Sequence, residues 1–419
     1  MSSLSQTQLN AFQTVMATLT PGNAFYLDKY QHAGIDLNQT WTPEAFYKLP
    51  FTVKSELSAD QIEHPPYGSA LSFPLESYTR LHQTSGTTTN RAMRWLDTAS
   101  SWAWLTNCWR TIFQLAKITS ADRVYFPFSF GPFLGFWSAF DAAAQMGMLA
   151  LPGGGMSTTA RLRFLLEHRA TVLCCTPTYA VHLADVAASE QLDIASSDIR
   201  AVIVAGEPGG SIPSTRQRIE QAWGARVFDH YGMTEVGPVA AECEEAPGGL
   251  HILEDDFIAE VLDAETGLPV PAGTTGELVI TNLGRHGSPL IRYRTGDVVM
   301  LDPEPCRCGR TWCKLFGGVQ GRTDDMIHIR GNNLYPSAIE AVVRRFPEIV
   351  EFRIIVDRSG PLADLKVQVE ASSGHDTPQL VHAVGQAIRD ALLFRAEVVL
   401  MPANSLPRYE MKARRVVIQ

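Results

Sequence analysis

The sequence predicts a multidomain α/β protein, with parallel α/β sheets and a β-rich subdomain in a large N-terminal domain and a small α+β domain at the C-terminus. The chain has 419 residues, more than one small core needs, so two or more domains are expected. Short apolar runs alternate with helical patterns in the first half, which favours a parallel sheet. After about Tyr231, turns separate strand-like runs, which indicates the β-rich part.

The N-terminal part begins with short helical patterns punctuated by proline and glycine. Leu49–Lys54 indicates the start of an extended segment, Tyr78–Gln83 predicts a strand, and Met93–Leu96 predicts a second one. Asp97 or Thr98 can cap the helix that follows. The apolar face of that helix carries Trp102, Leu105, Trp109 and Phe113.

The alternating region contains four apolar runs of buried-strand length. They are Val124–Pro127, Met148–Pro152, Thr171–Cys175 and Ala201–Ala205. Helical patterns lie between or after them, including Thr159–His168 and Pro213–Trp223, which Gly224 should end. This order is typical of parallel strands joined by crossover helices.

The last third divides into a β-rich segment and a smaller unit. The expected strands of the first are Phe257–Leu262, Gly276–Thr281 and Asp297–Leu301. From Asp324 onward, the expected elements are a helix at Pro336–Arg345, strands at Glu351–Val356 and Leu365–Val369, and a helix at Pro378–Leu393. We therefore predict an N-terminal domain of residues 1–323 and a C-terminal domain of residues 324–419.

Composition excludes several classes of protein. The formal net charge of −9, without a basic run, disfavours non-specific nucleic-acid binding. No apolar stretch reaches the roughly 18 residues that span a bilayer, and MSSLSQTQLNAFQTV lacks the regions of a secretory signal. We thus expect no nucleic-acid and no membrane partner. Seven cysteines are too sparse for a disulfide scaffold, which favours the reducing cytoplasm.

Two polar motifs suggest nucleotide chemistry. Thr84-Ser85-Gly86-Thr87-Thr88-Thr89 follows a strand, and its hydroxyl and N–H groups suit a polyphosphate, although such clusters are commonly solvated turns. It is not a Walker A loop, because no Gly-Lys-Ser/Thr follows. Tyr231-Gly232-Met233-Thr234-Glu235 follows the expected strand Arg226–Phe228. Its ring can stack on adenine, its hydroxyl can meet an α-phosphate and its carboxylate can hold Mg²⁺. The alternative is a loop with a surface glutamate.

The cysteines suggest a metal. Cys306 and Cys308 share one tight turn, and Cys243 is followed eight residues later by His251. Three thiols and an imidazole suit tetrahedral Zn²⁺, with Cys313 as a spare candidate, whereas buried free cysteines are the ordinary alternative. Cys108, Cys174 and Cys175 lie in apolar runs and are expected in the core.

An aromatic, glycine-rich stretch at residues 126–137 is a candidate ligand pocket. Such stretches are more often core than pocket, but Gly153–Gly155 and Thr176–Tyr179 are predicted loops after strands, where α/β sheets place ligands. An aromatic or otherwise apolar ligand would fit, since no cationic residue stands out in these segments. The candidate substrate-binding residues are Phe128, Phe133, Phe136, Gly154 and Tyr179.

In order and spacing, the motifs resemble those of the adenylate-forming enzymes, and within them the phenylacetate–coenzyme A ligase group. The resemblance rests on GRTDDMIHIRGNNLYPSAIE at 321–340, on YRTGD at 293–297 before it and on Lys412 near the end, and it runs from about Phe25 to Val417. Two positions depart from the family pattern, because Thr89 and Met411 replace glycines. Arg91 is the candidate for the positive charge expected in the first of these loops.

The resemblance implies roles for particular residues. Lys412, Thr234 and Glu235 would be catalytic, Asp324 would be the hinge of a mobile C-terminal domain, and related ligases favour zinc at Cys243, His251, Cys306 and Cys308. The implied ATP-binding residues are Thr84, Ser85, Gly86, Thr87, Thr88, Gly206, Glu207, Pro208, Asp229, Tyr231, Gly232, Met233, Asp297 and Arg322.

The implied activity is ATP-dependent conversion of a carboxylic acid, expected to be aromatic, to an acyl-adenylate and then to a coenzyme A thioester. ATP, Mg²⁺, coenzyme A and structural Zn²⁺ are the implied cofactors, and a homodimer is one expected assembly. Two alternatives stay open: transfer of the acyl group to an amine or a carrier-protein thiol, and a non-catalytic nucleotide-binding protein. The retained Glu235, Asp297, Arg322 and Lys412 argue against the second alternative.

Overall fold

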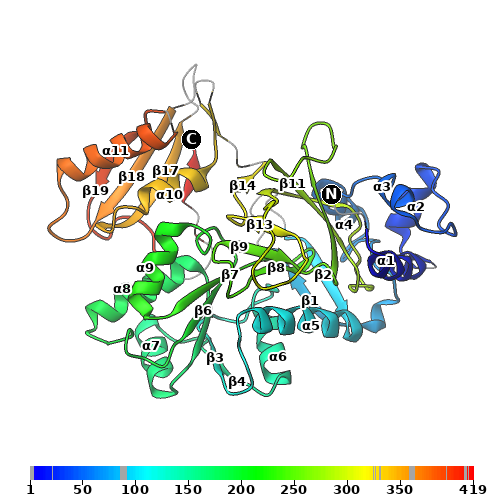
Figure 1. Ribbon diagram of the computed structural model, residues 1–419, viewed down its shortest axis with the longest axis horizontal. Helices are drawn as coiled ribbons and strands as arrows, with labels where there is room; N and C mark the ends of the chain where they lie inside the picture. The colour runs from blue at the N-terminus through cyan, green and yellow to red at the C-terminus, as the bar shows by residue number, and fades with distance from the viewer. Residues whose placement is uncertain are drawn as a thin grey trace. The chain divides into compact units, whose positions relative to one another are not determined.

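A computed structural model describes residues 4–20, 22–84, 92–323, 325, 327–329, 332–357, 364–392, 394–409, 413 and 415–419 (Figure 1). The chain divides into two units, each built from two separate segments. The first unit comprises Met1–Gly154 and His230–Gly318, and the second comprises Gly155–Asp229 and Val319–Gln419. Among the described residues, no helix is both long and apolar enough to cross a bilayer.

Four helices open the first unit: α1 (Gln6–Leu19), α2 (Ala24–His32), α3 (Pro43–Tyr47) and α4 (Lys54–Glu63). Side chains of Ser5, Asn23 and Thr42 accept a backbone N–H at the start of the first three helices. The predicted extended segment at Leu49–Lys54 ends sooner than expected, because Lys54 already begins α4. The carboxylate of Glu56 accepts the N–H of Val53 and thereby fixes that start.

The rest of the first unit is built mainly from strands, one group of which joins β8 (Gly237–Glu242), β9 (Gly249–Ile252) and β13 (Lys314–Phe316) in antiparallel pairs. The strands β1 (Tyr78–Gln83) and β2 (Arg94–Thr98) are antiparallel, and Thr98 caps α5 (Ala99–Leu115). The strands β3 (Arg123–Phe126) and β4 (Leu149–Pro152) are parallel, with α6 (Trp137–Gln145) between them.

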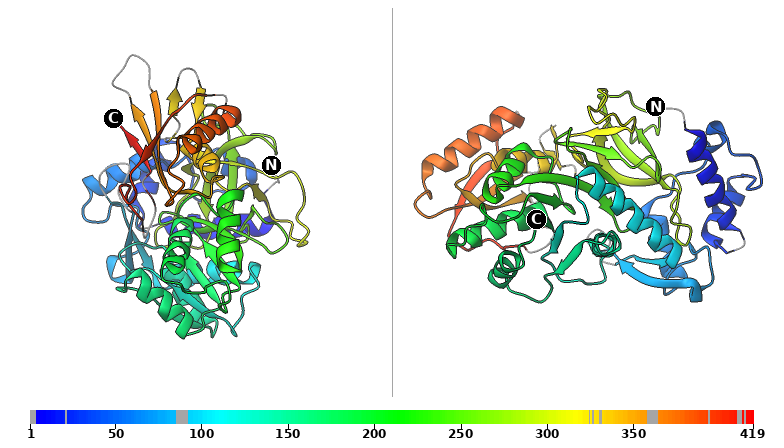
Figure 2. Two further views of the ribbon diagram at one scale, coloured as in Figure 1. Left: turned by 90° about the vertical axis from the view of Figure 1, so that its left-hand side faces the viewer. Right: turned by 60° about the horizontal axis from the view of Figure 1, so that its bottom comes forward.

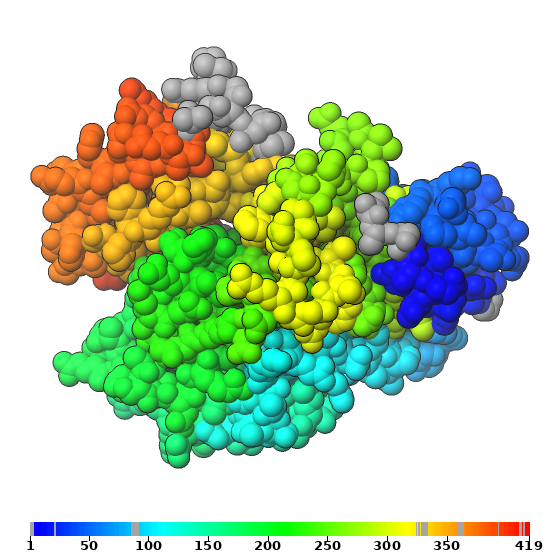
Figure 3. All heavy atoms as spheres, in the orientation of Figure 1, coloured from blue at the N-terminus to red at the C-terminus, as the bar shows by residue number. Residues whose placement is uncertain are grey.

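An antiparallel meander consists of β10 (Phe257–Leu262), β11 (Thr275–Asn282) and β12 (Tyr293–Met300). The N-terminal helices pack against this meander (Figure 3), because Phe12, Tyr26 and Tyr30 share a core with Ile258 and Ile291. The predicted β-rich subdomain is thus present.

The first segment of the second unit has the predicted parallel strands. The strands β5 (Val172–Cys175), β6 (Ala201–Val204) and the first residues of β7 (Arg226–Met233) pair in parallel. The helices are α7 (Thr158–Glu167), α8 (Pro177–Ser189) and α9 (Pro213–Trp223). Gly224 ends α9 as predicted, with a positive φ of 59° that favours glycine.

One predicted loop in this segment is wrong. Thr176–Tyr179 is not a loop after β5, because Pro177 begins α8 and Tyr179 lies in its first turn. The side chain of Thr176 caps the helix and proline suits its first position, which explains the early start.

The second segment of the second unit forms a small α+β fold. The strands β14 (Gly321–Arg322), β15 (Ile327–Ile329) and β16 (Asn332–Leu334) precede a sheet of order β19-β18-β17-β20, made from Glu397–Met401, Asp364–Ala371, Ile349–Asp357 and Val416–Ile418. Helices α10 (Pro336–Val343) and α11 (Pro378–Leu392) share one apolar core with this sheet (Figures 1 and 2). The predicted helices and strands are therefore found, with small shifts at their ends.

Candidate active site

The motif Tyr231–Glu235 lies on a β-hairpin rather than in a loop after a short strand. The strand β7 continues to Met233 and pairs with β8 (Gly237–Glu242). A Cβ on Gly232 would lie 2.7 Å from the carbonyl oxygen of Gly237, so a larger residue would force the two strands apart. Thr234 and Glu235 therefore occupy the turn of the hairpin, where a short connection limits their backbone freedom.

The carboxylate of Glu235 is buried and paired with a cation. The residue is 6% exposed, and one of its oxygens lies 3.1 Å from Nζ of Lys54, at the start of α4. Sequence reasoning missed Lys54, which is 181 residues from Glu235 along the chain. Its position at a helix start after an apolar segment gave no sign of a charged partner.

A buried ion pair also holds the turn at Thr234 and Glu235, through the backbone carbonyls of these residues. Arg285 donates to both carboxylate oxygens of Asp97 at 2.7 Å, and its remaining amino group donates to the carbonyls of Thr234 and Glu235 at 2.7 and 2.9 Å. Both side chains are fully buried. Burial acts to raise the pKa of Asp97, but the guanidinium of Arg285 outweighs it, so the pKa is lowered and the carboxylate is charged.

Asp297 lies beside Tyr231 in the same unit. The Tyr231 hydroxyl donates to Oδ2 of Asp297 at 2.6 Å, and Asp297 is 5% exposed on β12. The N–H of Asp297 donates to the hydroxyl oxygen of Thr295. The structure thus brings together the predicted adenine and ribose contacts from strands far apart in sequence.

Other predicted nucleotide residues belong to the second unit. Gly206, Glu207 and Pro208 follow β6, and Asp229 accepts the hydroxyl of Ser211 at 2.5 Å. Glu207 uses both carboxylate oxygens on backbone N–H groups, those of Thr178 at 2.9 Å and of Ala413 at 2.7 Å.

Arg322 is half-buried on β14 and its guanidinium lies 4.0 Å from the carboxylate of Asp325. Several predicted residues lie outside the described part of the chain. These are Ser85, Gly86, Thr87, Thr88, Thr89, Arg91, Asp324, Met411 and Lys412. Thr84 is described, and it closes the base of its loop through two hydrogen bonds with the backbone of Met93.

The candidate acid-binding aromatics form a cluster in the first unit. The ring of Phe128 lies 4.7 Å from that of Phe130 and 5.3 Å from that of Phe136, centroid to centroid. A Cβ on Gly154 would be 3.4 Å from the carbonyl oxygen of Phe128, so Gly154 lies against this cluster. Phe133 is half-buried, with its ring beside Gly131.

Tyr179 has a polar partner that the sequence did not reveal. The Tyr179 side chain is buried in the second unit, where its hydroxyl accepts from the guanidinium of Arg161 at 2.6 Å. Arg161 itself is only 2% exposed. The sequence gave no sign of a cation here, because Arg161 lies within the helical pattern between two predicted loops.

The predicted metal ligands converge. One ligand atom from each of Cys243, His251, Cys306 and Cys308 lies within 4.8 Å of the others. Sγ of Cys243 is 3.6 Å from Sγ of Cys306, and Sγ of Cys308 is 3.5 Å from Nε2 of His251. Ligand bonds of about 2.0–2.3 Å in a tetrahedron place such atoms roughly 3.5–3.8 Å apart. Cys313, the spare candidate, is not part of this group.

Protonation at the cluster follows from burial and hydrogen bonding. Burial lowers the pKa of His251, which keeps its imidazole neutral. Burial acts to raise the pKa of Cys308, but hydrogen bonds from the Arg310 backbone and from neighbouring groups outweigh it, so this pKa is lowered. Burial and the Cys306 thiol raise the pKa of Cys243 to about 12. A bound cation would favour the thiolate forms.

Comparisons with known proteins identify the family of this chain. Residues 76–284 match the AMP-binding enzyme family, and residues 331–419 match the AMP-binding enzyme C-terminal domain. The chain is 31% identical to a phenylacetate-coenzyme A ligase of Thermus thermophilus over 94% of this chain and 91% of that one. It is 29% identical to the enzyme of the same name from Escherichia coli, over 98% and 94% of the two chains.

Solved structures of a CoA ligase are similar to this chain over most of its length. A 2-hydroxyisobutyryl-CoA ligase in the postadenylation state, in complex with 2-HIB-AMP, is 30% identical with a TM-score of 0.93, over 98% of this chain and 89% of that one. The same ligase, in complex with 2-HIB-AMP and CoA in the thioesterification state, is 31% identical with a TM-score of 0.74, over 98% and 88% of the chains.

Proposed function

This chain belongs to the family of AMP-binding enzymes that includes the phenylacetate-coenzyme A ligases, and we propose that it joins a carboxylic acid to coenzyme A in two steps. First, the acid carboxylate attacks the α-phosphorus of ATP, which forms an acyl-adenylate and releases pyrophosphate. Then the thiol of coenzyme A attacks the acyl carbon, and AMP leaves. The hairpin turn with the buried Glu235, beside Tyr231 and Asp297, is the observation that carries this proposal.

The first step requires donors and positive charge at the α-phosphate, because negative charge gathers there in the transition state. We assign these roles to Lys412 and Thr234. Glu235 would hold Mg²⁺, and a single buried carboxylate suits this ion, which proteins commonly bind through one or two carboxylates plus substrate phosphates. When bound, Mg²⁺ would neutralise phosphate charge. Lys54 supplies a further positive charge beside that carboxylate.

ATP recognition is assigned to the remaining predicted residues. Asp297 would accept hydrogen bonds from the ribose hydroxyls, and Tyr231 would stack on adenine while its hydroxyl orients Asp297. Asp229, Gly206 and Pro208 would border the base, and Arg322 would contact the ribose. The loop 84–88 would hold the phosphates.

The acid is proposed to be aromatic. The relatives from Thermus thermophilus and Escherichia coli are named for phenylacetate, and the cluster of Phe128 and Phe136 offers the apolar surface that such a ring needs. Roles for Phe133, Gly154 and Tyr179 in acid binding remain predictions. Tyr179 would contact the acid with its aromatic ring, since its hydroxyl already accepts a hydrogen bond from Arg161.

The alternation between the two steps is proposed to involve residues 324–419, which would rotate about Asp324 as one domain. A 2-hydroxyisobutyryl-CoA ligase has been solved in postadenylation and thioesterification states, which supports two working states for such an enzyme. Rotation would withdraw Lys412 after the first step and admit the thiol.

We further propose a structural zinc at Cys243, His251, Cys306 and Cys308. The Cys243–Cys306 and Cys308–His251 distances fit a tetrahedral ion, and four protein ligands leave no open position for catalysis. When bound, zinc would tie the β8–β9 hairpin to the segment around residues 306–308. Elemental analysis of the purified protein should find one zinc per chain.

The ligand assignment can be tested with a matched pair of variants. Cys306→Ser with Cys308→Ser should lose the zinc and lower the thermal midpoint. Cys313→Ser should retain the zinc and the thermal midpoint of the wild type. Loss of zinc from Cys313→Ser, or zinc-free wild-type protein of full stability, would contradict the assignment.

Pyrophosphate release from ATP with a panel of carboxylic acids tests the function itself. With coenzyme A, an arylacetic or benzoic acid should give continuous release, and without it a single turnover. Continuous release only with an amine or a carrier-protein thiol would favour the alternative acceptors. Nucleotide binding without any release would favour a non-catalytic protein. Cytoplasmic location and a homodimer are further proposals, which fractionation and light scattering would test.

A further inference from the structure

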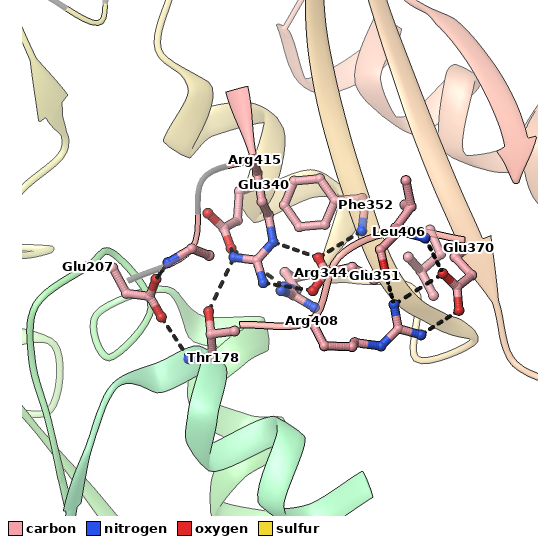
Figure 4. A network of polar contacts seen from close by, with 12 residues as sticks. Thr178, Glu207, Glu340, Arg344, Glu351, Phe352, Glu370, Leu406, Arg408 and Arg415 are labelled. Carbon is pink, nitrogen blue, oxygen red and sulfur yellow. Dashed lines mark hydrogen bonds and ion pairs between the residues drawn. The ribbon is translucent and has the colours of Figure 1, made fainter. Parts of the chain in front are cut away.

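Glu207 connects two distant segments of the second unit (Figure 4). One carboxylate oxygen accepts the N–H of Thr178 in the first turn of α8, at 2.9 Å. The other accepts the N–H of Ala413, at 2.7 Å, from a segment 206 residues away in the chain. Hydrogen bonds to a charged acceptor are the stronger kind, so this carboxylate holds the C-terminal segment by its backbone.

Arg415 holds the same segment two residues later. Its Nε and Nη2 donate to the two oxygens of Glu351 at 2.6 and 3.2 Å, and its Nη1 donates to the hydroxyl oxygen of Thr178 at 3.2 Å. Glu340 lies 3.4 Å from the same guanidinium. The side chain of Arg415 is 6% exposed, and its carbonyl accepts the N–H of Ile354. The segment is therefore held at Ala413 and Arg415 against both α8 and β17.

This tether lies next to Lys412. Consecutive Cα atoms are about 3.8 Å apart, so the hydrogen bond at the N–H of Ala413 acts one residue from the proposed catalytic lysine. A catalytic side chain acts well only when neighbouring contacts hold it in place before the reaction. Both oxygens of Glu207 are occupied by backbone N–H groups, which favours a positioning role over the direct ATP contact that the resemblance implied.

We propose that Glu207, supported by Arg415, is a positioning residue that places Lys412 for adenylate formation and has no part in thioester formation. The proposal rests on the proposed function, in which Lys412 acts in the first step alone. Glu207→Gln is the direct test, because the amide keeps one acceptor oxygen and replaces the other with an N–H donor. The variant can therefore serve only one of the two backbone N–H groups.

Three measurements on Glu207→Gln separate positioning from other roles. The single-turnover rate of adenylate formation should fall about 10- to 100-fold, the loss of one charge-assisted hydrogen bond. The Kd for ATP and the rate of thioester formation from a synthetic acyl-adenylate should stay within about threefold, a change worth less than roughly 0.7 kcal/mol. Glu220→Gln is the matched control, since Glu220 accepts the N–H of Val227 in the same unit, away from this segment. It should behave like wild type.

A double variant decides whether Glu207 acts through the lysine. Added to Lys412→Ala, Glu207→Gln should cost no further activity, because the group that it positions is gone. A full additional loss, a weakened ATP Kd or equal losses in both steps would overturn the proposal. Should Glu207→Gln be unstable, Glu207→Asp, which keeps the charge but shortens the reach, is measured in the same way. A wild-type enzyme that forms no adenylate would instead refute the proposed function.

Discussion

Two short segments with proposed roles at the α-phosphate are supported in different ways. The Thr234–Glu235 turn lies on a continuous hairpin, and the buried Arg285–Asp97 pair binds its carbonyls. Ala413 and Arg415, which follow Lys412 in the sequence, are instead held by carboxylates from elements far apart in sequence. The Arg285–Asp97 pair, which is the first support, is fully buried, whereas Glu207 in the second support is half-buried. Breaking the first should therefore destabilise the fold, and breaking the second should impair one reaction step.

The largest effect is expected at the first support. Arg285→Met should lower the free energy of unfolding by about 3–5 kcal/mol, because it leaves the Asp97 carboxylate buried without its partner. Urea denaturation of variant and wild type measures this change. Adding Asp97→Asn should recover part of the loss, since the buried charge is then removed. A loss below about 1 kcal/mol would show that the pair does not stabilise the turn as described.

Lys412, which directly precedes the second support in the sequence, should affect catalysis rather than stability. Lys412→Ala should lower the rate of adenylate formation by about 10²–10³-fold, the usual cost of losing one electrostatic contact to a transition state. Thioester formation from a supplied acyl-adenylate should be unchanged, and so should the thermal midpoint. Equal losses in both half-reactions would refute the two-state account of the C-terminal domain.

Asp297 should affect substrate binding rather than folding. Asp297→Ala should weaken ATP binding roughly 10- to 1000-fold, because two charge-assisted hydrogen bonds of about 1.5–3 kcal/mol each are lost without adding fully. Calorimetry should find unchanged affinity for the acid alone. Tyr231→Phe keeps the ring and removes only the donor to Asp297, so its effect should be smaller. An Asp297→Ala variant with normal ATP affinity would mean that the ribose site is misassigned.

The smallest expected effect is a pH-dependent change in stability that comes from Asp256 in the first unit. Burial raises the pKa of Asp256, which accepts from Trp104, to about 6. A raised folded-state pKa contributes stability that is full below the unfolded value of 3.8 and is lost as pH rises through about 6. Asp256→Asn should therefore gain about 1–3 kcal/mol relative to wild type between pH 4 and pH 7. Unfolding measured across that range would contradict this if the difference did not change with pH.

The fold was largely predictable from local signals. The helix Pro213–Trp223 and the strand Phe257–Leu262 have the predicted ends, because Pro213, Gly224 and the apolar run mark them. The misplaced start of α8 came from reading Thr176-Pro177 as a loop, although a capping threonine followed by proline is a common helix start. The length of β7 was missed because its end depends on pairing with β8.

Some residues of the site were also predictable from the sequence, and others were not. Tyr231, Asp297 and the cysteine–histidine cluster are marked by residue type and spacing, and the structure brings each set together. Lys54 and Arg285 carry no such mark, since the partner of Arg285 lies 188 residues earlier in the chain. The positioning role proposed for Glu207 was not visible in the sequence either, because a motif does not show which backbone N–H groups its carboxylate accepts. Long-range pairs become visible only in the folded chain.

The central claim is that this protein is an AMP-forming ligase, and the products of one complete turnover test it most directly. With ATP, Mg²⁺, coenzyme A and the best acid of the panel, chromatography with mass detection should find AMP, pyrophosphate and acyl-CoA in equal amounts. Omission of coenzyme A should leave one acyl-adenylate per active site. Formation of ADP and phosphate, or of AMP without any acyl product, would contradict the claim.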